Sequence, residues 1–390
     1  MDYLSIWINQ WILLKIMSTL SFRVDMLEWA ANNIGLHLDD VVSKVSESER
    51  TQKKLLEGKF SVNQAENFAE ITKVPFGVLF LDHPPIEIYK PAIPDLRQKQ
   101  NAEPLSDFFY EVLDDVQKKQ DWYVEFLIEN NAEKLDFVGK FKNQPNINAD
   151  IIANDIRQKL HLPIDLHTRT SRENHLKQLI IRCEKAGILV FKNSIVKYAT
   201  KKTLDTNEFR GFVLSNEYAP VVFLNGQDMP SAMIFTLAHE LAHIWLGESG
   251  VDDLDIYGND PTEVLCNKIA ASVLISESEF NEAWEVYFGD ISWIANVFHV
   301  SKLMVSRLAL TYNRITSIEY QAIHDAEKEA FRNRPKQDGA PNFLSLVPGR
   351  NSPLLTNAVV NQAMSGNMLL RDAGRLLNVS PQNIMKLGGM

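Results

Sequence analysis

Residues 236–247 read TLAHELAHIWLG, and the prediction of both fold and function starts from this stretch. It contains the pattern HExxH, with His239 and His243 four residues apart and Glu240 between them. Because residues four apart lie one turn above each other on an α-helix, both imidazoles can reach one metal ion. Glu240 then lies beside that face, where a carboxylate can take a proton from water that the metal activates. The stretch predicts a Zn²⁺ site with His239 and His243 as ligands and Glu240 as the catalytic base.

The surrounding sequence favours a metal site over two ordinary buried histidines. Histidines at this spacing can also be core residues whose hydrogen bonds are satisfied within the protein. Here the remaining positions of the predicted helix are apolar and allow tight packing, and two strand-like segments come directly before it. Gly247 then ends the helix, as glycine often does.

A catalytic zinc site usually has three protein ligands and one open position, so a third ligand is needed. Ser249 stands where a metzincin would have its third histidine. Glu263 is the favoured ligand, because it opens a second apolar helix whose small side chains allow close packing against the first. The acidic run 252–255 is interpreted as a solvated loop. The full set of candidates is Glu248, Asp252, Asp253, Asp255, Glu263 and His299.

The composition is that of a soluble globular protein. The chain has 390 residues, of which 45% are hydrophobic and 23% are charged, and this length suggests about two or three domains. Collagen-like, low-complexity and wholly disordered classes are excluded. Two cysteines cannot staple a secreted fold, so a cytoplasmic location and His and carboxylate ligands are expected. The net charge of -10 argues against a protein that coats nucleic acid through bulk electrostatics.

The N-terminal segment is apolar but does not predict a membrane span. Polar residues interrupt the run over 3–17, which is also short for a bilayer crossing. A signal peptide would need a basic start and a cleavage site of small residues. Two interpretations stay open, an extra amphipathic helix or a true start of translation at Met17.

Along the rest of the chain the pattern predicts an α+β protein in which helices dominate. Short helices over 26–81, broken by glycines, predict a compact helix-turn-helix-like bundle, and residues 104–180 are also predicted to be helical. Runs rich in Val, Phe and Leu predict a small sheet with strands at 187–196, 209–215 and 219–225. Further helices are predicted at 231–246, 262–275, 278–288 and 291–312.

Several motifs give this chain a resemblance to one known family. The run FTLAHELAHIWLG at 235–247, the pattern ExxCNxxAA at 263–271 and the lead-in at 210–226 resemble the ImmA/IrrE family of metallo-endopeptidases. The N-terminal part is similar to the Xre-type helix-turn-helix module often fused to that peptidase, through MLEWA at 26–30 and the proline-containing stretch at 75–97. The C-terminal tail also resembles such fusions.

The resemblance implies a zinc-dependent endopeptidase of the bacterial or phage cytoplasm. It implies His239 and His243 as zinc ligands, Glu263 as the third ligand and Glu240 as the base. The family's known targets are repressors or antitoxins, often Xre-type and encoded nearby, whose cleavage relieves repression under stress. The expected partner is therefore one specific protein substrate.

With this resemblance, five segments are expected in the chain. They are an extra N-terminal segment at 1–20, an Xre-like helix-turn-helix domain at 21–90, a linker and helical region at 91–180, a zinc metallopeptidase domain at 181–332 and a small helical tail at 340–390. The strand before the active helix is expected to hold an extended peptide by edge pairing.

DNA binding by the Xre-like domain is weakly supported by its charge. Residues 55–59 read LLEGK where the module usually has a Trp-Glu-x-Gly-Glu pattern, and residues 1–97 hold 10 basic and 13 acidic side chains. Docking of a related repressor or antitoxin is therefore favoured. Residues 340–390 hold four basic side chains and one acidic one, which makes the tail the better candidate for contact with nucleic acid. Segments 294–308 and 373–387 also faintly echo the helix-turn-helix pattern.

One alternative function and several minor candidates stay open. The alternative is a DNA-binding transcriptional regulator or antitoxin in which the metal site is only structural. Cys183 and Cys266 are interpreted as small core residues rather than nucleophiles. Tyr218, Tyr257 and His299 are conceivable oxyanion stabilisers, and nothing in the spacing selects among them.

Overall fold

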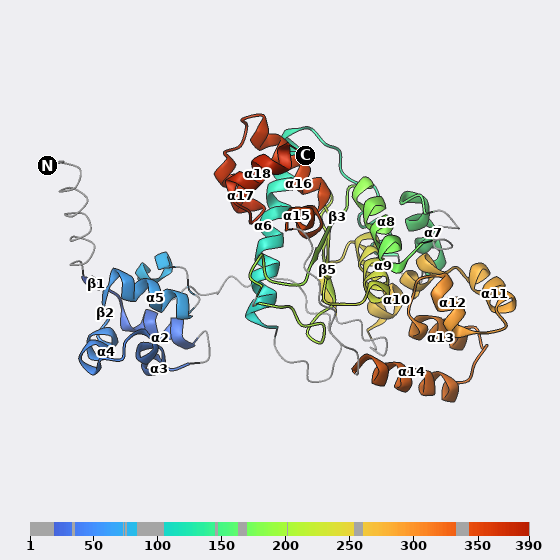
Figure 1. The fold of residues 1–390 in the computed structure, drawn as a ribbon, viewed down its shortest axis with the longest axis horizontal. Coiled ribbons are helices and arrows are strands. Elements are labelled where there is room, and N and C mark those ends of the chain that lie inside the picture. The colour runs from blue at the N-terminus through green and yellow to red at the C-terminus, as the bar shows by residue number, and fades with distance from the viewer. Residues whose placement is uncertain are drawn as a thin grey trace. The chain divides into compact units, whose positions relative to one another are not determined.

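The chain folds into two compact units, Met1–Lys90 and Pro91–Met390, which are described one after the other (Figure 1). The expected N-terminal segment 1–20, apart from its last two residues, and the candidate start at Met17 lie outside the described residues. The computed structural model describes residues 19–32, 36–72, 74, 76–83, 105–144, 147–162, 170–200, 202–252, 260–332 and 343–389.

The first unit is a helical bundle with a short antiparallel sheet. The strands are β1 (Thr19–Ser21) and β2 (Lys59–Ser61), which the sequence did not predict because three residues are too few to show a period. The predicted helices are present. They are α2 (Val24–Asn32), α3 (Leu38–Val45), α4 (Glu49–Leu56) and α5 (Val62–Thr72), followed by the 3-10 helix η1 (Phe76–Phe80).

The turn from α4 into β2 requires glycine. Gly58 has φ 79°, and a Cβ there would lie 2.1 Å from the carbonyl oxygen of Phe22. Phe22 N also donates a hydrogen bond of 2.9 Å to the Gly58 carbonyl, so the two backbones touch. Phe22 packs edge-on against Phe60, which packs edge-on against Phe68 at the centre of the unit's apolar core.

The second unit is built around a mixed sheet with the strand order β3-β5-β4-β6. Strands β3 (Leu189–Asn193) and β5 (Val221–Asn225) are parallel, whereas β4 (Gly211–Leu214) is antiparallel to β5 and also to β6 (Gly250–Asp252). The three predicted strands are confirmed in slightly shorter form. The fourth strand, β6, corrects the prediction that the acidic run beginning at Asp252 is entirely loop.

Both faces of this sheet are covered by helices (Figure 1). The helices that follow the linker are α6 (Asp107–Glu129), α7 (Ala149–Lys159) and α8 (Arg172–Lys185). Those that carry or flank the HExxH pattern are α9 (Pro230–Leu246), α10 (Pro261–Leu274), α11 (Glu277–Val286), α12 (Ile291–Val297), α13 (Lys302–Thr311) and α14 (Ser317–Arg332). The C-terminal helices are α15 (Phe343–Asn351), α16 (Pro353–Met364), α17 (Leu370–Leu376) and α18 (Pro381–Gly388).

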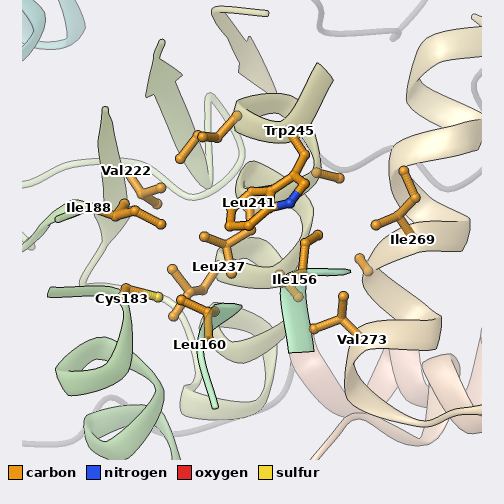
Figure 2. Packing of buried hydrophobic residues seen from close by; sticks show 14 of the residues in the cluster. Ile156, Leu160, Cys183, Ile188, Val222, Leu237, Leu241, Trp245, Ile269 and Val273 are labelled. Carbon is orange, nitrogen blue, oxygen red and sulfur yellow. The ribbon is translucent and has the colours of Figure 1, made fainter. Parts of the chain in front are cut away.

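Alternate residues of each strand enter two different cores, as the pleat of a sheet requires. On β5, Val222 and Leu224 join the core formed with α7, α8, α9 and α10. Figure 2 shows this core, with Leu237, Leu241 and Trp245 of α9 at its centre. The neighbouring β5 residues pack into the second core, which contains apolar residues of α6, α16, α17 and α18. The C-terminal helices therefore complete a core rather than extend from it as a tail.

The expected α+β class with dominant helices is confirmed. One predicted helix, 291–312, is in fact two, α12 and α13, separated by a turn in which His299 has φ 58°. Apolar residues of α12 and α13 face the same core. The apolar pattern of the sequence therefore continues across the turn and resembles that of a single helix. Among the described helices, none combines the length and the apolar content that a membrane crossing requires.

A buried carboxylate joins α8 to the start of α16. Glu184 accepts hydrogen bonds from Leu354 N at 2.8 Å, Ser352 Oγ at 3.0 Å and Val190 N at 2.7 Å. Burial raises the pKa of Glu184 to about 7, although these three hydrogen bonds act in the opposite direction.

This pKa predicts a specific loss of stability as pH rises from about 4.5 to about 7. Between the unfolded pKa near 4.5 and the folded pKa near 7, the folded state keeps a proton that the unfolded state has released. The stabilisation is thus complete below the lower pKa and is lost as pH rises through the higher one. The free energy of unfolding falls by about 3 kcal/mol over this range. We expect Glu184→Gln to remove this part of the pH dependence, measured by urea unfolding from pH 5 to 8. The exposed Glu173→Gln should keep it, and equal slopes in wild type and Glu184→Gln would contradict the assignment.

Candidate metal centre

Helix α9 carries the HExxH pattern through the interior of the second unit. Residues 236–246 are all buried, and Gly247 ends the helix in the left-handed region at φ 73°. A helix that is apolar on every side belongs in a core, and this one also carries two imidazoles and a carboxylate. Buried polar groups are costly unless they are paired, so these side chains need partners inside the protein.

Three side chains from α9 and α10 converge on one point. His239 Nε2 lies 3.0 Å from His243 Nε2 and 3.1 Å from Glu263 Oε2. His243 Nε2 lies 3.4 Å from Glu263 Oε1, and all three residues are buried. Glu263 belongs to the first turn of α10, where the small buried residues Cys266 and Ala270 let the two helices pack closely.

This donor set fits a divalent metal ion such as zinc. Ligands about 2.0–2.1 Å from a tetrahedral centre stand about 3.3 Å apart, close to the three separations above. Two Nε2 atoms that face each other at 3.0 Å can share only one proton. Glu263 Oε1 accepts no hydrogen bond from the described part of the chain. A cation between the three groups would satisfy all of them at once.

Two further residues of α10 contact the ligand histidines. Asn267 Oδ1 lies 3.1 Å from His239 Nδ1, so it can accept that proton and leave Nε2 for the metal. Cys266 Sγ lies 3.6 Å from His243 Nδ1. From the sequence, Cys266 is predicted to be a core residue, and no role is predicted for Asn267. Their spacing from Glu263, three and four residues, could have placed both on the ligand-bearing face.

Neighbouring groups shift the pKa values of His243 and Glu263. Burial acts to lower the pKa of His243, but Cys266, Glu248 and Glu263 together raise it well above its ordinary value. Burial likewise acts to raise the pKa of Glu263, and pairing with the two histidines outweighs it and lowers that pKa. Since a metal must displace the imidazole proton, metal binding is expected to weaken as pH falls.

The Glu240 carboxylate lies against strand β4 at Gly211, where there is room for no residue larger than glycine. A Cβ on Gly211 would lie 2.9 Å from Glu240 Oε1 and 2.6 Å from Thr236 Cγ2. The missing side chain of Gly211 therefore leaves the space that the Glu240 carboxylate occupies. Gly211 was not singled out from the sequence, because its closeness to α9 depends on the fold.

The other candidate ligands are not part of this cluster. Glu248 contacts His243 from the opposite ring nitrogen, Nδ1, at 3.6 Å. His299 lies in the turn between α12 and α13, where its ring is 5.3 Å from that of His175. Asp252 pairs through its backbone with β4. Asp253, Asp255 and the oxyanion candidate Tyr257 lie outside the described residues.

The expected edge pairing by the strand before α9 is wrong. That strand is β5, which has β3 on one side and β4 on the other, so no edge of it is open. Strand β4 lies beside Glu240 at Gly211, and its outer edge is occupied by β6, with Gly211 opposite Asp252 and Phe212 opposite Val251. The pairing depends on contacts distant in sequence, which the local pattern did not contain.

Comparison with known proteins agrees with this geometry. Residues 183–309, about a third of the chain, match the peptidase M78 family model, described as an IrrE N-terminal-like domain. This match supports a metallopeptidase-family role and includes all three residues of the buried cluster. Residues 351–389 match a domain of unknown function, DUF8813. No curated protein and no solved structure gives a significant match.

The ligand set predicts how single substitutions change metal binding. Purified protein should hold one zinc ion, and Glu263→Ala should lose most of it, because a charged ligand is removed. Asn267→Ala should weaken zinc binding by about 10–100-fold, since it removes the partner that orients His239. Competition with a chelator of known affinity measures both effects. Lys268→Ala, on the exposed face of the same helix, is the control. Undiminished zinc in Glu263→Ala would show that the ligand assignment is wrong.

Proposed function

We propose that the chain is a zinc-dependent endopeptidase that cleaves one specific protein partner. The observation that carries this proposal is the buried cluster of His239, His243 and Glu263 with Glu240 on the same helix. Two imidazoles and one carboxylate form the ligand set of a thermolysin-like catalytic zinc site, which keeps its fourth position for water or substrate. The M78 family match over this region supports the same assignment.

The residues of the chain have distinct roles in this reaction. A bound zinc ion supplies Lewis acidity, which makes water a stronger acid and polarises the substrate carbonyl. Glu240 takes the proton from the attacking water as its oxygen bonds to the peptide carbon. The same carboxylate then gives that proton to the leaving amine nitrogen as the carbon–nitrogen bond breaks. Asn267 holds the His239 ring in orientation, and Gly211 leaves room for Glu240.

We infer that the substrate is a repressor or antitoxin in the cytoplasm. The support is the resemblance of residues 235–247 and 263–271 to the ImmA/IrrE peptidases, whose targets are proteins of this kind. The first unit would dock that partner, because the start of α3 carries Asp39 and Asp40, which disfavour contact with DNA phosphates. Cleavage would then relieve repression under stress.

One observation favours the alternative, a DNA-binding regulator or antitoxin with a structural metal. The two histidines are fully buried and Glu263 is only 3% exposed, whereas catalytic sites must admit a substrate. In the endopeptidase, β6 would have to move, because it pairs with the outer edge of β4, the strand whose Gly211 lies beside Glu240. An extended substrate that pairs with β4 must first displace β6.

Replacing Glu240 tests the chemistry directly. Glu240→Gln should lose about 10²–10⁴-fold in cleavage rate, because the proton-transferring group is gone, while zinc stays bound at one equivalent. Proteomic comparison of cells that express wild type or Glu240→Gln should reveal one protein cut only by wild type. If that protein is cut equally by the variant, Glu240 is not the base. If wild type cuts nothing and still binds DNA in the cell, the structural-metal alternative is favoured.

Loosening β6 tests the displacement step. Val251 is fully buried in the core beside Phe212, and Val251→Ala should weaken β6 by about 1.5 kcal/mol, or about tenfold in its open population. We expect faster removal of zinc by a chelator and faster cleavage of the partner. Val116→Ala, in the same core but on α6, should cost similar stability without either gain. Equal rates of zinc removal in the two variants would contradict the role of β6.

A further inference from the structure

The turn between α17 and α18 ends its first helix with a hydrogen bond common at helix C-termini, which also occurs between α12 and α13, between α2 and α3 and at other helix ends of the described residues. Val379 N donates to the Gly374 carbonyl at 2.8 Å across this turn. Across the turn between α12 and α13, Val300 N donates to the Ala295 carbonyl at 3.1 Å. In the first unit, Leu36 N donates to the Ala31 carbonyl at 3.2 Å between α2 and α3. All three bonds span five residues.

The residues next to this bond also correspond. Asn378 and His299 occupy the same position in the turn, and both lie in the left-handed region, at φ 56° and 58°. The next helix is capped by Ser380 in one case and Ser301 in the other. Gly374 must be small, because a Cβ there would lie 2.7 Å from the Val379 carbonyl oxygen. The four-residue connection between α17 and α18 has the length found in helix-turn-helix motifs.

We propose that residues 351–389, which match a domain of unknown function, bind duplex DNA through α18. In a helix-turn-helix protein the second helix enters the major groove, and the residues of its first turn contact the bases. In α18 these positions carry Gln382 and Asn383, whose amides can pair with adenine. Gln382 and Lys386 are exposed, whereas Ile384 points into the core.

At the corresponding positions, the other two pairs of helices carry side chains that do not suit DNA binding. In α3 they are Asp39 and Asp40, which repel phosphates. In α13 they are Leu303 and Met304, of which Met304 is buried, and α14 packs along the helix. Of these three pairs of helices, α18 carries amide side chains in its first turn, and amides suit a DNA groove better than the acidic or apolar side chains of α3 and α13.

The charge of the C-terminal region supports the same ligand. In a motif of this kind the first helix crosses the DNA backbone. Here that helix is α17, whose Arg371 and Arg375 side chains are 64% and 74% exposed. Both contact Asp372, but surface ion pairs of this kind contribute little and can open to a phosphate. With Lys386, they place three cations around α18 in a chain whose net charge is -10.

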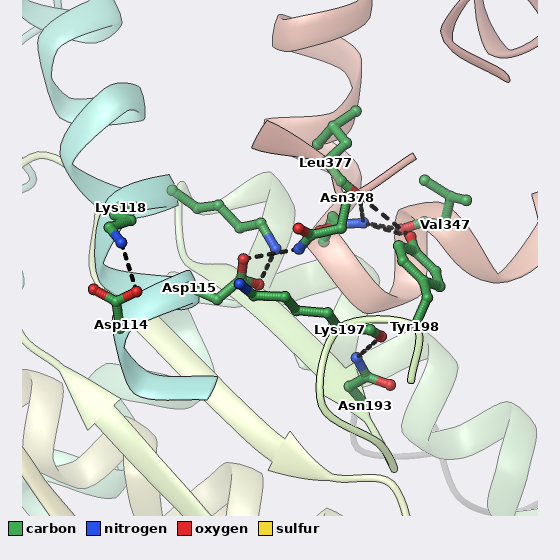
Figure 3. Close-up of polar contacts among 11 residues, drawn as sticks. Asp114, Asp115, Lys118, Asn193, Lys197, Tyr198, Val347, Leu377 and Asn378 are labelled. Carbon is green, nitrogen blue, oxygen red and sulfur yellow. Dashed lines mark hydrogen bonds and ion pairs between the residues drawn. The ribbon is translucent and has the colours of Figure 1, made fainter. Parts of the chain in front are cut away.

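The proposed DNA-binding unit is fixed to the body of the second unit. Figure 3 shows the turn held by polar contacts with other segments of the second unit. Asn378 Nδ2 donates to Asp115 Oδ1 of α6 at 2.8 Å, and Tyr198 Oη donates to the Leu377 carbonyl at 3.3 Å. Asn351 Nδ2 donates to the same carbonyl at 3.2 Å. DNA bound by α18 would therefore hold the metal centre at a fixed place beside it.

The test is fluorescence anisotropy of a mixed-sequence 24-base-pair duplex with the full-length, zinc-loaded chain. We expect micromolar binding at about 50 mM salt, with a slope of log K against log salt of about −2.7 for three phosphate contacts. The triple variant Arg371→Gln, Arg375→Gln, Lys386→Gln should abolish binding and keep its zinc and its circular dichroism. Gln382→Ala should leave the salt slope unchanged and reduce the preference among a pool of random duplexes.

A matched triple variant in the first unit is the control. Lys44→Gln, Lys53→Gln, Lys54→Gln removes three exposed cations from the region of α3 and α4, and it should bind DNA as wild type does. The proposal is wrong if wild type shows no binding at up to about 100 μM protein, which equals the weakest usual non-specific Kd at physiological salt, where binding is weaker than at about 50 mM. It is also wrong if the C-terminal triple variant binds normally. Neither result bears on the peptidase proposal, because Glu240 takes no part in this assay.

Discussion

The pairing of two imidazoles with one carboxylate in an apolar core is the interaction on which the second unit depends. His239 and His243 are carried by a helix that is buried on every side, where unpaired polar groups would be strongly unfavourable. Glu263 relieves this cost only if α10 packs directly on α9, and a metal ion would satisfy the atoms that remain. The position of α10, the small residues between the helices and the glycine at position 211 all follow from this requirement.

The need to bury apolar surface also determines how helices pack on the sheet in the rest of the unit. Its strands are buried on both faces, so helices must cover both, and the chain uses its C-terminal helices for one of them. Residues 351–389 thereby share a core with α6 and are joined to α8 through Glu184. A region that looks like an appendage in the sequence is a structural part of the domain that carries the metal centre.

Turns of similar form show how far the backbone alone leaves function open. The turns between α12 and α13 and between α17 and α18 share a hydrogen bond and a left-handed residue, because this common way of ending a helix allows few geometries. The side chains at the start of the second helix differ from one case to the next. A motif of this form positions side chains, and those side chains decide what is bound.

Much of the metal centre could be predicted from the sequence, because its geometry is largely local. The helical period places His239, Glu240 and His243 on neighbouring positions, and an apolar helix opening with Glu263 suggested the third ligand. Strand positions and the α+β class likewise follow from periods that extend over a few residues.

The remaining features depend on which segments meet, and no local pattern records this. Gly211 matters because β4 crosses Glu240, and β6 matters because it pairs with the edge that a substrate would need. The break at His299 was concealed by apolar residues that serve one core from two helices. In each case the energy comes from contact between residues distant in sequence, so only the tertiary structure fixes the outcome.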